Sequence, residues 1–530
     1  MLTRAGTPTP WSYFLIRILF KFVLKIFYGS IVVENVDVIP KTGVPCIVCA
    51  NHSNSLTDAL LLVTSIPPSR RNMLRLTAKS TQFGKKTFTS WLIENAGTVP
   101  IHRRKDFGDG PVDNSENMLQ LIKALETGDA VCLFPEGMSR YHPTIAPLKT
   151  GVARLVSDVL SRNRNEPDFE ITLLSCSITY MHRQHWRSDV LITFHEPATF
   201  RPKDNPELLE PVSYDAIRGV TTQLYKQISS GTIDSPSWDL VRISKLAARI
   251  YAPLGTRMSL GDHVRAVRSF LEAFKLLEQD EDETGPAFDK NQLAQLSSGL
   301  KMYQNEISRC GLKDDRIRKP LPRHVIIYRM IIRLAWSGFL LFISIPGLCL
   351  WFPVFATTNY FVRSHKRSGP VFDTWDEITQ HKLLTGLASG LAVWLSVVLL
   401  TLPIAFLTSI FVPACMWMTL RWIEDGVASF RAFVALYRLL RLGKSNFWKL
   451  QEQRTQLQNQ VMTLATTLDL PPDPENYFAE AGGREKGRVR GTWDSRARYF
   501  SIKRRRKRDW NETLRLYDKV DYPEDDTLRG

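Results

Sequence analysis

The stretch that decides the fold of this chain is PCIVCANHSNSLTDALLLV, residues 45–63. Its first part, residues 45–50, is an apolar run that predicts a buried β-strand. A polar turn follows and carries His52 and Asp58, and the apolar residues 59–63 predict a helix after the turn. The stretch therefore predicts a strand and a helix joined by a turn that carries a histidine and an aspartate.

Strands and helices alternate on both sides of this stretch. Apolar runs at 130–134, 171–180 and 190–194 predict further strands, and apolar residues at helical spacing predict a helix over 117–125. Such alternation is typical of an α/β fold in which helices cover a sheet whose strands are largely parallel. We therefore expect a layered α/β domain over residues 31–235.

Composition points to a membrane-associated protein of more than one domain. The chain has 530 residues, of which 44% are hydrophobic, and its formal charge is +16. A basic chain suits nucleic acid, anionic lipid or anionic substrates, and the long apolar runs favour lipid. The seven cysteines are scattered, which argues against a disulfide framework and for a reducing compartment. Cys46 and Cys49 are interpreted as core residues of a strand.

Residues 1–30 predict an amphipathic helix that lies in the plane of a membrane. Arg17, Lys21 and Lys25 fall on one stripe of such a helix. The opposite face carries the apolar residues Leu15, Leu19, Val23 and Ile26. The alternative is a surface helix that packs on the neighbouring domain.

Two long uncharged runs predict a transmembrane helical hairpin over 321–425. They cover 334–362 and 383–420, and each exceeds the ~20 residues that span a bilayer. The second run is long for one span, and Pro403 and Pro413 are candidate breaks. Basic residues flank the pair on its outer sides, so the positive-inside rule places both ends in the cytosol.

The remaining regions are less informative. Residues 236–320 predict a polar helical region, and residues 426–470 predict amphipathic helices. Residues 471–530 predict a basic disordered tail. That tail contains KRRRKR at 503–508, a run that binds anionic lipid headgroups near a membrane, or serves as a nuclear signal or nucleic-acid patch.

Three segments, taken in order, resemble the blocks of the glycerolipid acyltransferase family. They are NHSNSLTD at 51–58, GTVPIHR at 97–103 and FPEGMS at 134–139. The whole layout resembles the fungal-type enzymes that accept glycerol 3-phosphate or dihydroxyacetone phosphate. Members of this family move a fatty acyl group from acyl-CoA to a hydroxyl of a glycerol phosphate.

The chemistry of that reaction gives roles to His52 and Asp58. A glycerol hydroxyl is a poor nucleophile at neutral pH, so a base must remove its proton as it attacks the thioester. His52 is the candidate base, and Asp58 would fix its tautomer and stabilise the imidazolium. Five residues separate the two, one more than is usual in the family, and the fungal-type enzymes share this longer spacing.

The resemblance implies that Arg103 binds the phosphate of the acceptor. A guanidinium matches a phosphate dianion in geometry and charge. Arg104 and Lys105 are the alternatives if the register differs.

The third block supplies the other candidate residues for substrate binding. The resemblance implies that Glu136, preceded by Pro135, helps to bind the glycerol part and that Gly137 allows close backbone approach. Ser139 is a candidate contact to a phosphate or hydroxyl, and Lys149 offers a further cation.

These residues together predict acylation of the sn-1 hydroxyl of glycerol 3-phosphate to lysophosphatidate. Acyl-CoA is the co-substrate, and no cofactor, metal or nucleic acid is expected. We expect a multi-pass protein of the endoplasmic reticulum membrane with its catalytic domain and both termini in the cytosol. The alternatives are a lysophospholipid (1-acylglycerol-3-phosphate) acyltransferase or transacylase, and a non-enzymatic, basic, membrane-anchored binding protein.

Overall fold

The computed structural model describes residues 5–102, 114–252, 256, 258–278, 290–318 and 321–480. The chain divides into two units. The first unit runs to Asp234 and also includes the distant segment Pro370–Gln380. The second unit comprises Ser235–Gly369 and the chain from His381 onward.

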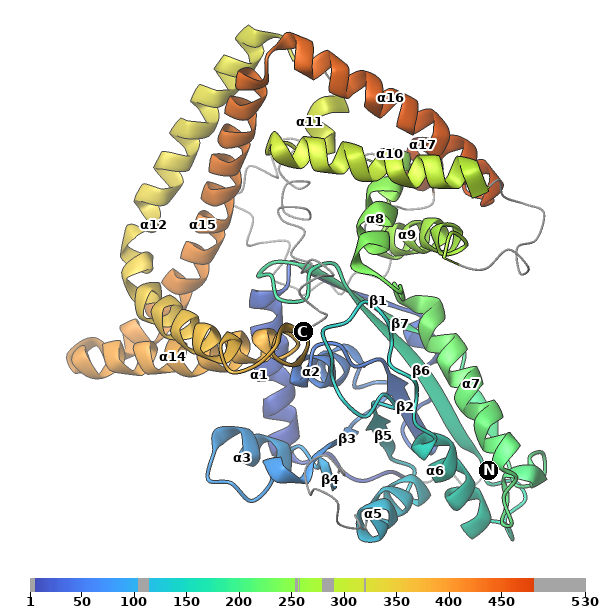
Figure 1. Ribbon diagram of the computed structural model, residues 1–530. Coiled ribbons are helices and arrows are strands. Elements are labelled where there is room, and N and C mark those ends of the chain that lie inside the picture. The colour runs from blue at the N-terminus through green and yellow to red at the C-terminus, as the bar shows by residue number, and fades with distance from the viewer. Residues whose placement is uncertain are drawn as a thin grey trace. The chain divides into compact units, whose positions relative to one another are not determined.

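The first unit is built on a sheet of eight described strands, in the order β1-β7-β6-β2-β5-β3-β4, with β8 beside β6 (Figure 1). Most neighbouring strands are parallel, while β6 runs antiparallel to β7 and β8. This confirms the α/β class expected from the sequence. The strands are β1 Ser30–Glu34, β2 Cys46–Ala50, β3 Leu74–Lys79, β4 Val99–Ile101, β5 Ala130–Leu133, β6 Ile171–Tyr180, β7 Asp189–Phe194 and β8 Ala198–Phe200.

Strand β2 lies in the middle of the sheet, between β5 and β6. Ile47 pairs with Val131 on one side and with Leu173 on the other. Every residue of β2 is buried, which explains its continuous apolar sequence, because a central parallel strand is covered on both faces. Cys46 and Cys49 are buried in this strand as free thiols.

Helices cover both faces of the sheet (Figure 1). Helices α5, α6 and α7 share one apolar core with the strands, whereas α1 and α2 lie on the opposite face. The helices of this unit are α1 Trp11–Phe27, α2 Leu56–Ser65, α3 Phe88–Asn95, α5 Ser115–Glu126, α6 Gly151–Arg162, α7 Tyr214–Gly231 and the short α13 Val371–Thr374.

Helix α1 buries a different face from the one that the sequence predicted. Arg17, expected on the polar stripe, is buried, and its guanidinium donates to the carbonyl of Asn72 at 3.5 Å. Leu15, expected on the apolar face, is exposed instead. Both faces of the helix are largely apolar, so spacing alone could not choose the buried one. The exposed face carries the large apolar residues Trp11, Phe14, Leu15, Ile18 and Phe22.

The second unit is helical in its described part. It begins with a polar group of helices and continues with the apolar ones. The helices are α8 Trp238–Tyr251, α9 Leu260–Lys275, α10 Lys290–Arg309, α11 Asp314–Arg318, α12 Arg323–Lys366, α14 Ile378–Leu400, α15 Ala405–Leu442, α16 Lys444–Thr467 and α17 Pro474–Glu480, and α14 starts within the first unit.

Three helices, rather than the expected two of a hairpin, are long and apolar enough to cross a membrane. They are α12, α14 and α15, the last preceded by a short 3-10 turn at Leu402–Ile404. The second uncharged run is therefore broken at Pro403, whereas Pro413 lies inside α15. Proline prevents the regular helix hydrogen bond, which accounts for a break at this position.

The apolar helices of the second unit pack on one another. Val354 of α12 shares a buried cluster with Val412 and Met416 of α15, and Trp394 of α14 packs against it. A side chain at Gly347 would overlap Thr419, so this glycine permits close approach of α12 and α15. Of the predicted basic tail, residues 471–480 are described and contain helix α17, whereas residues 481–530, which include 503–508, lie outside the described residues.

Candidate active site

The sequence motifs follow parallel strands that end at the same edge of the sheet. His52 follows β2, Glu136 follows β5, and Arg103 comes after β4, and these strands are connected by parallel pairings through β3. The carboxyl edge of an open parallel sheet is where such folds bind ligands. Arg103, Arg104 and Lys105 themselves lie outside the described residues.

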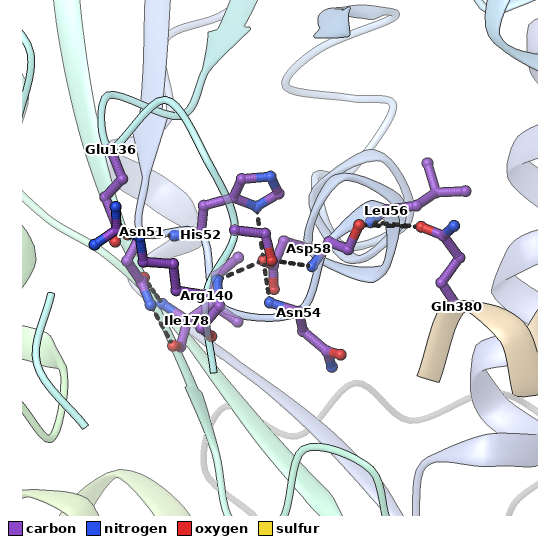
Figure 2. Close-up of polar contacts among 12 residues, drawn as sticks. Asn51, His52, Asn54, Leu56, Asp58, Glu136, Arg140, Ile178 and Gln380 are labelled. Atoms are coloured by element: carbon purple, nitrogen blue, oxygen red, sulfur yellow. Dashed lines mark hydrogen bonds and ion pairs between the residues drawn. The ribbon is translucent and has the colours of Figure 1, made fainter. Parts of the chain in front are cut away.

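His52 and Asp58 form the pair expected from the sequence (Figure 2). The distance between His52 Nδ1 and Asp58 Oδ2 is 3.0 Å, and the Asp58 side chain is completely buried. A carboxylate at Nδ1 favours the tautomer that carries the proton there, so Nε2 is left to accept a proton. His52 also stacks on the ring of Phe134, with 4.1 Å between the centroids, which fixes the plane of the imidazole.

Asp58 accepts hydrogen bonds from other donors in addition to His52. Its Oδ2 also accepts from the backbone amides of Ser53 at 2.9 Å and Asn54 at 2.8 Å. Its Oδ1 accepts from the hydroxyl of Tyr180. Burial, followed by the charge of Asp58, raises the pKa of Tyr180 well above its usual value, so this phenol remains a donor. These contacts keep the Asp58 carboxylate in one orientation.

Glu136 joins the third motif to the first through contacts with backbone amides. Its Oε1 accepts from the amide of His52 at 2.6 Å, and its Oε2 accepts from the amide of Ala146 at 3.0 Å. Burial raises the pKa of this carboxyl, while the two amide contacts oppose that effect. The geometry gives Glu136 a positioning role for His52, and the expected contact with glycerol stays a prediction.

Gly137 adopts a backbone conformation that suits glycine. Its φ is +75°, and a Cβ at this position would lie 2.5 Å from Nζ of Lys149. The backbone amide of Lys149 donates to the carbonyl of Pro135 at 2.8 Å. Lys149 is exposed beside the motif, so its ammonium is available to a phosphate.

Ser139 lies at the turn that carries the histidine. Its Oγ accepts from the backbone amide of Ser55 at 3.0 Å. Ser55 has a φ of 45°, in the left-handed region that residues other than glycine rarely adopt. Ser139 therefore helps to hold the strained turn between His52 and Asp58.

Two residues of the site were not identified from the sequence. Asn51 exchanges two hydrogen bonds with the backbone of Ile178, at 2.9 and 2.7 Å, and so ties the end of β2 to β6 (Figure 2). Tyr180, at the end of β6, provides the phenol donor to Asp58. The pairing of β6 with β2 explains both contacts, and no local sequence signal announces them.

The first unit matches a known family over its central part. Residues 30–179 match the model of the family described as Acyltransferase. These residues form an acyltransferase-family domain. Residues 243–369, after this acyltransferase domain, match the family described as Glycerol-3-phosphate acyltransferase 2 C-terminal domain.

Three fungal proteins are similar to this chain. An uncharacterised acyltransferase of Schizosaccharomyces pombe is 24% identical over 68% of the chain and 56% of its own length. Glycerol-3-phosphate O-acyltransferase 2 of Saccharomyces cerevisiae is 22% identical over 49% of the chain and 33% of its own length. Glycerol-3-phosphate O-acyltransferase 1 of the same yeast is 21% identical over 46% of the chain and 31% of its own length. The matches thus span about half or less of each relative.

Proposed function

We propose that this chain is an acyl-CoA-dependent acyltransferase that acylates the sn-1 hydroxyl of glycerol 3-phosphate and forms lysophosphatidate. The observation that carries the proposal is the His52–Asp58 pair, 3.0 Å apart, at the carboxyl edge of an acyltransferase-family sheet. The names of the two Saccharomyces cerevisiae relatives support glycerol 3-phosphate as the acceptor. Dihydroxyacetone phosphate is a second candidate acceptor.

His52 acts as the general base in the proposed reaction. Its Nε2 takes the proton of the acceptor hydroxyl while that oxygen attacks the thioester carbonyl carbon of acyl-CoA. The new ester C–O bond forms, the C–S bond breaks, and the imidazolium returns the proton to the leaving thiolate. Asp58 stabilises the imidazolium, and a base so placed contributes about 10²–10⁴-fold to the rate.

The acceptor is held by its phosphate and by its glycerol part. We propose that Arg103 binds the phosphate of the acceptor, that Lys149 supplies a further positive charge, and that the hydroxyl of Ser139 makes an additional contact. No metal or cofactor is needed for this acyl transfer, because the leaving group is already activated as a thioester.

A membrane location suits the lipid product. The apolar helices α12, α14 and α15 support association with a bilayer, and the exposed apolar face of α1 would lie against the same membrane. We place the protein at the endoplasmic reticulum with the catalytic unit on the cytosolic side, because acyl-CoA is soluble in the cytosol. The expectation that both termini share that side assumed two spans, and three crossing helices would place the two ends on opposite sides.

Acyl transfer from labelled palmitoyl-CoA tests the proposal. Membranes that carry the wild type, His52→Ala or the control His324→Ala are offered glycerol 3-phosphate, dihydroxyacetone phosphate and lysophosphatidate separately. His324 is an exposed histidine at the start of α12. Loss of transfer in His52→Ala alone supports the proposed base, and the preferred acceptor identifies the reaction.

Other outcomes identify the alternatives. A preference for lysophosphatidate or another lysophospholipid would identify a lysophospholipid acyltransferase or transacylase. Equal transfer by wild type and His52→Ala, or none by either, would overturn the catalytic proposal. Deletion of residues 503–530 separates the non-enzymatic alternative, since a basic binding protein loses its activity with the tail whereas acyl transfer does not.

A further inference from the structure

The segment Pro370–Gln380 belongs to the first unit, although it lies between the apolar helices α12 and α14 in the sequence. The carbonyl of Phe372 accepts from the amide of Tyr141 at 3.2 Å. Trp375 meets the ring of Tyr141 edge-on, with 5.4 Å between the centroids. Thr379 donates to the carbonyl of Arg183 at 2.8 Å. These contacts fix the segment beside the loop that follows the Glu136 motif.

Gln380 holds the turn between His52 and Asp58. Its amide oxygen accepts from the hydroxyl of Ser55 at 3.1 Å and from the backbone amide of Leu56 at 3.3 Å (Figure 2). Leu56 is the first residue of α2, whose free amides otherwise lack a partner within the helix. A side chain from outside the motif therefore stabilises the strained position of Ser55.

Asp376 lies in the same site and has an unused oxygen. Its side chain is buried, and it accepts a hydrogen bond from the hydroxyl of Ser139. Its Oδ1 has no hydrogen-bond partner in the described part of the chain. Asp376 precedes by four residues Gln380, whose side chain holds the turn between His52 and Asp58. A buried carboxylate oxygen without a donor is costly unless a ligand supplies one.

We propose that Asp376 selects the acceptor, its Oδ1 accepting a hydrogen bond from the hydroxyl of glycerol 3-phosphate that is not acylated. The proposal rests on the proposed function. An ionised carboxylate is only an acceptor. The carbon-2 hydroxyl of glycerol 3-phosphate is a donor, whereas the ketone oxygen of dihydroxyacetone phosphate is an acceptor. Asp376 therefore favours glycerol 3-phosphate over dihydroxyacetone phosphate.

The two acceptors give a test that a merely structural role cannot imitate. The full-length protein in membranes is assayed with palmitoyl-CoA as wild type, Asp376→Asn and the control Asp373→Asn, which changes an exposed aspartate of the same segment. The amide of Asp376→Asn still accepts from Ser139 and offers a donor where Oδ1 was. We expect kcat/KM for glycerol 3-phosphate, relative to dihydroxyacetone phosphate, to fall about 10- to 100-fold, the size of a hydrogen bond to a charged group.

Gln380→Ala separates positioning from selection. We expect kcat to fall for both acceptors together with their ratio unchanged, and Gln380→Glu to restore activity because its carboxylate also accepts from Ser55 and Leu56. A ratio that changes in Gln380→Ala as much as in Asp376→Asn would assign selection to the turn and overturn the role of Asp376.

The outcomes distinguish this inference from the proposed function. A wild type that acylates neither acceptor would refute the proposed function. A wild type active on glycerol 3-phosphate whose acceptor ratio is unchanged in Asp376→Asn would refute only the role of Asp376. A ratio that falls in Asp376→Asn but not in Asp373→Asn supports it.

Discussion

Two parts of the site each contribute a buried aspartate, and the two carboxylates are treated in opposite ways. In the turn at 51–58, Asp58 accepts from His52, two backbone amides and Tyr180. In Pro370–Gln380, Asp376 accepts from Ser139 and keeps Oδ1 without a partner in the described residues. We call Asp58 the saturated carboxylate, because both of its oxygens accept hydrogen bonds, and Asp376 the unsaturated one, because one of its oxygens has no donor among the described residues. The first is suited to fixing a catalytic histidine, and the second is suited to binding a ligand.

The largest effect is expected at the saturated carboxylate. Asp58→Asn removes the charge that stabilises the imidazolium and no longer dictates the tautomer of His52, so kcat should fall about 10²–10⁴-fold. The measurement is acyl transfer at saturating palmitoyl-CoA. Asp37→Asn is the control, because the Asp37 side chain is 97% exposed. A kcat in Asp58→Asn equal to that of the control would contradict the role of Asp58 in supporting the catalytic histidine.

At the unsaturated carboxylate we expect an effect on stability that depends on pH. Burial, opposed by Ser139 and His52 and assisted by Glu377, raises the pKa of Asp376 from 3.8 to about 6. The folded protein therefore binds this proton more tightly than the unfolded chain. The stability that the protonated form contributes is complete below pH 3.8 and is lost as the pH rises through about 6.

Asp376→Asn remains neutral across this range and keeps that stability. In the absence of acceptor, the free energy of unfolding of Asp376→Asn at pH 8 should exceed that of the wild type by up to about 3 kcal/mol. This gain should disappear near pH 4. Thermal unfolding in detergent at the two pH values measures the difference. A gain of equal size at both pH values would mean that the charge of Asp376 is not its source.

Removal of one donor to Asp58 tests how far saturation matters. Tyr180→Phe deletes a hydrogen bond to a charged group, worth about 1.5–3 kcal/mol, and should lower kcat about tenfold with little change in KM. Tyr214→Phe is the control, since Tyr214 is 51% exposed. Unchanged kcat in Tyr180→Phe would show that the two backbone amides suffice to hold Asp58.

The smallest effect is expected at Gly137. Gly137→Ala forces a side chain into a left-handed conformation and should cost about 1–2 kcal/mol of stability, while the flexible end of Lys149 moves aside. The melting temperature reports this cost. Gly219→Ala, at a helical position of α7 with open space around it, should be neutral or stabilising. A melting temperature of Gly137→Ala equal to that of the control would contradict the expectation.

The saturated part of the site was predictable from the sequence, and the unsaturated part was not. His52 and Asp58 lie six positions apart on one turn, and a parallel sheet brings Glu136 to the same edge. Gln380 lies 325 positions from Ser55, in a flank between apolar runs that carries no motif. Only tertiary packing brings that flank to the site.

Tertiary packing also decided two other features. Tyr180 lies 122 positions from Asp58, and the strand that carries it had no assigned role. Helix α1 has apolar residues on both faces, so its orientation depended on the burial of Arg17 against Asn72. Spacing identifies an amphipathic helix, but it does not choose between two apolar faces.

The position of Pro370–Gln380 also constrains how the chain is threaded through a bilayer. Because this segment is part of the catalytic unit, the chain is on the catalytic side when α12 ends. The end of α12 and the start of α14 therefore lie on the catalytic side of the bilayer. A cysteine at Ser368 should then react with a membrane-impermeant maleimide from the same side of sealed vesicles as one at the exposed Asp37.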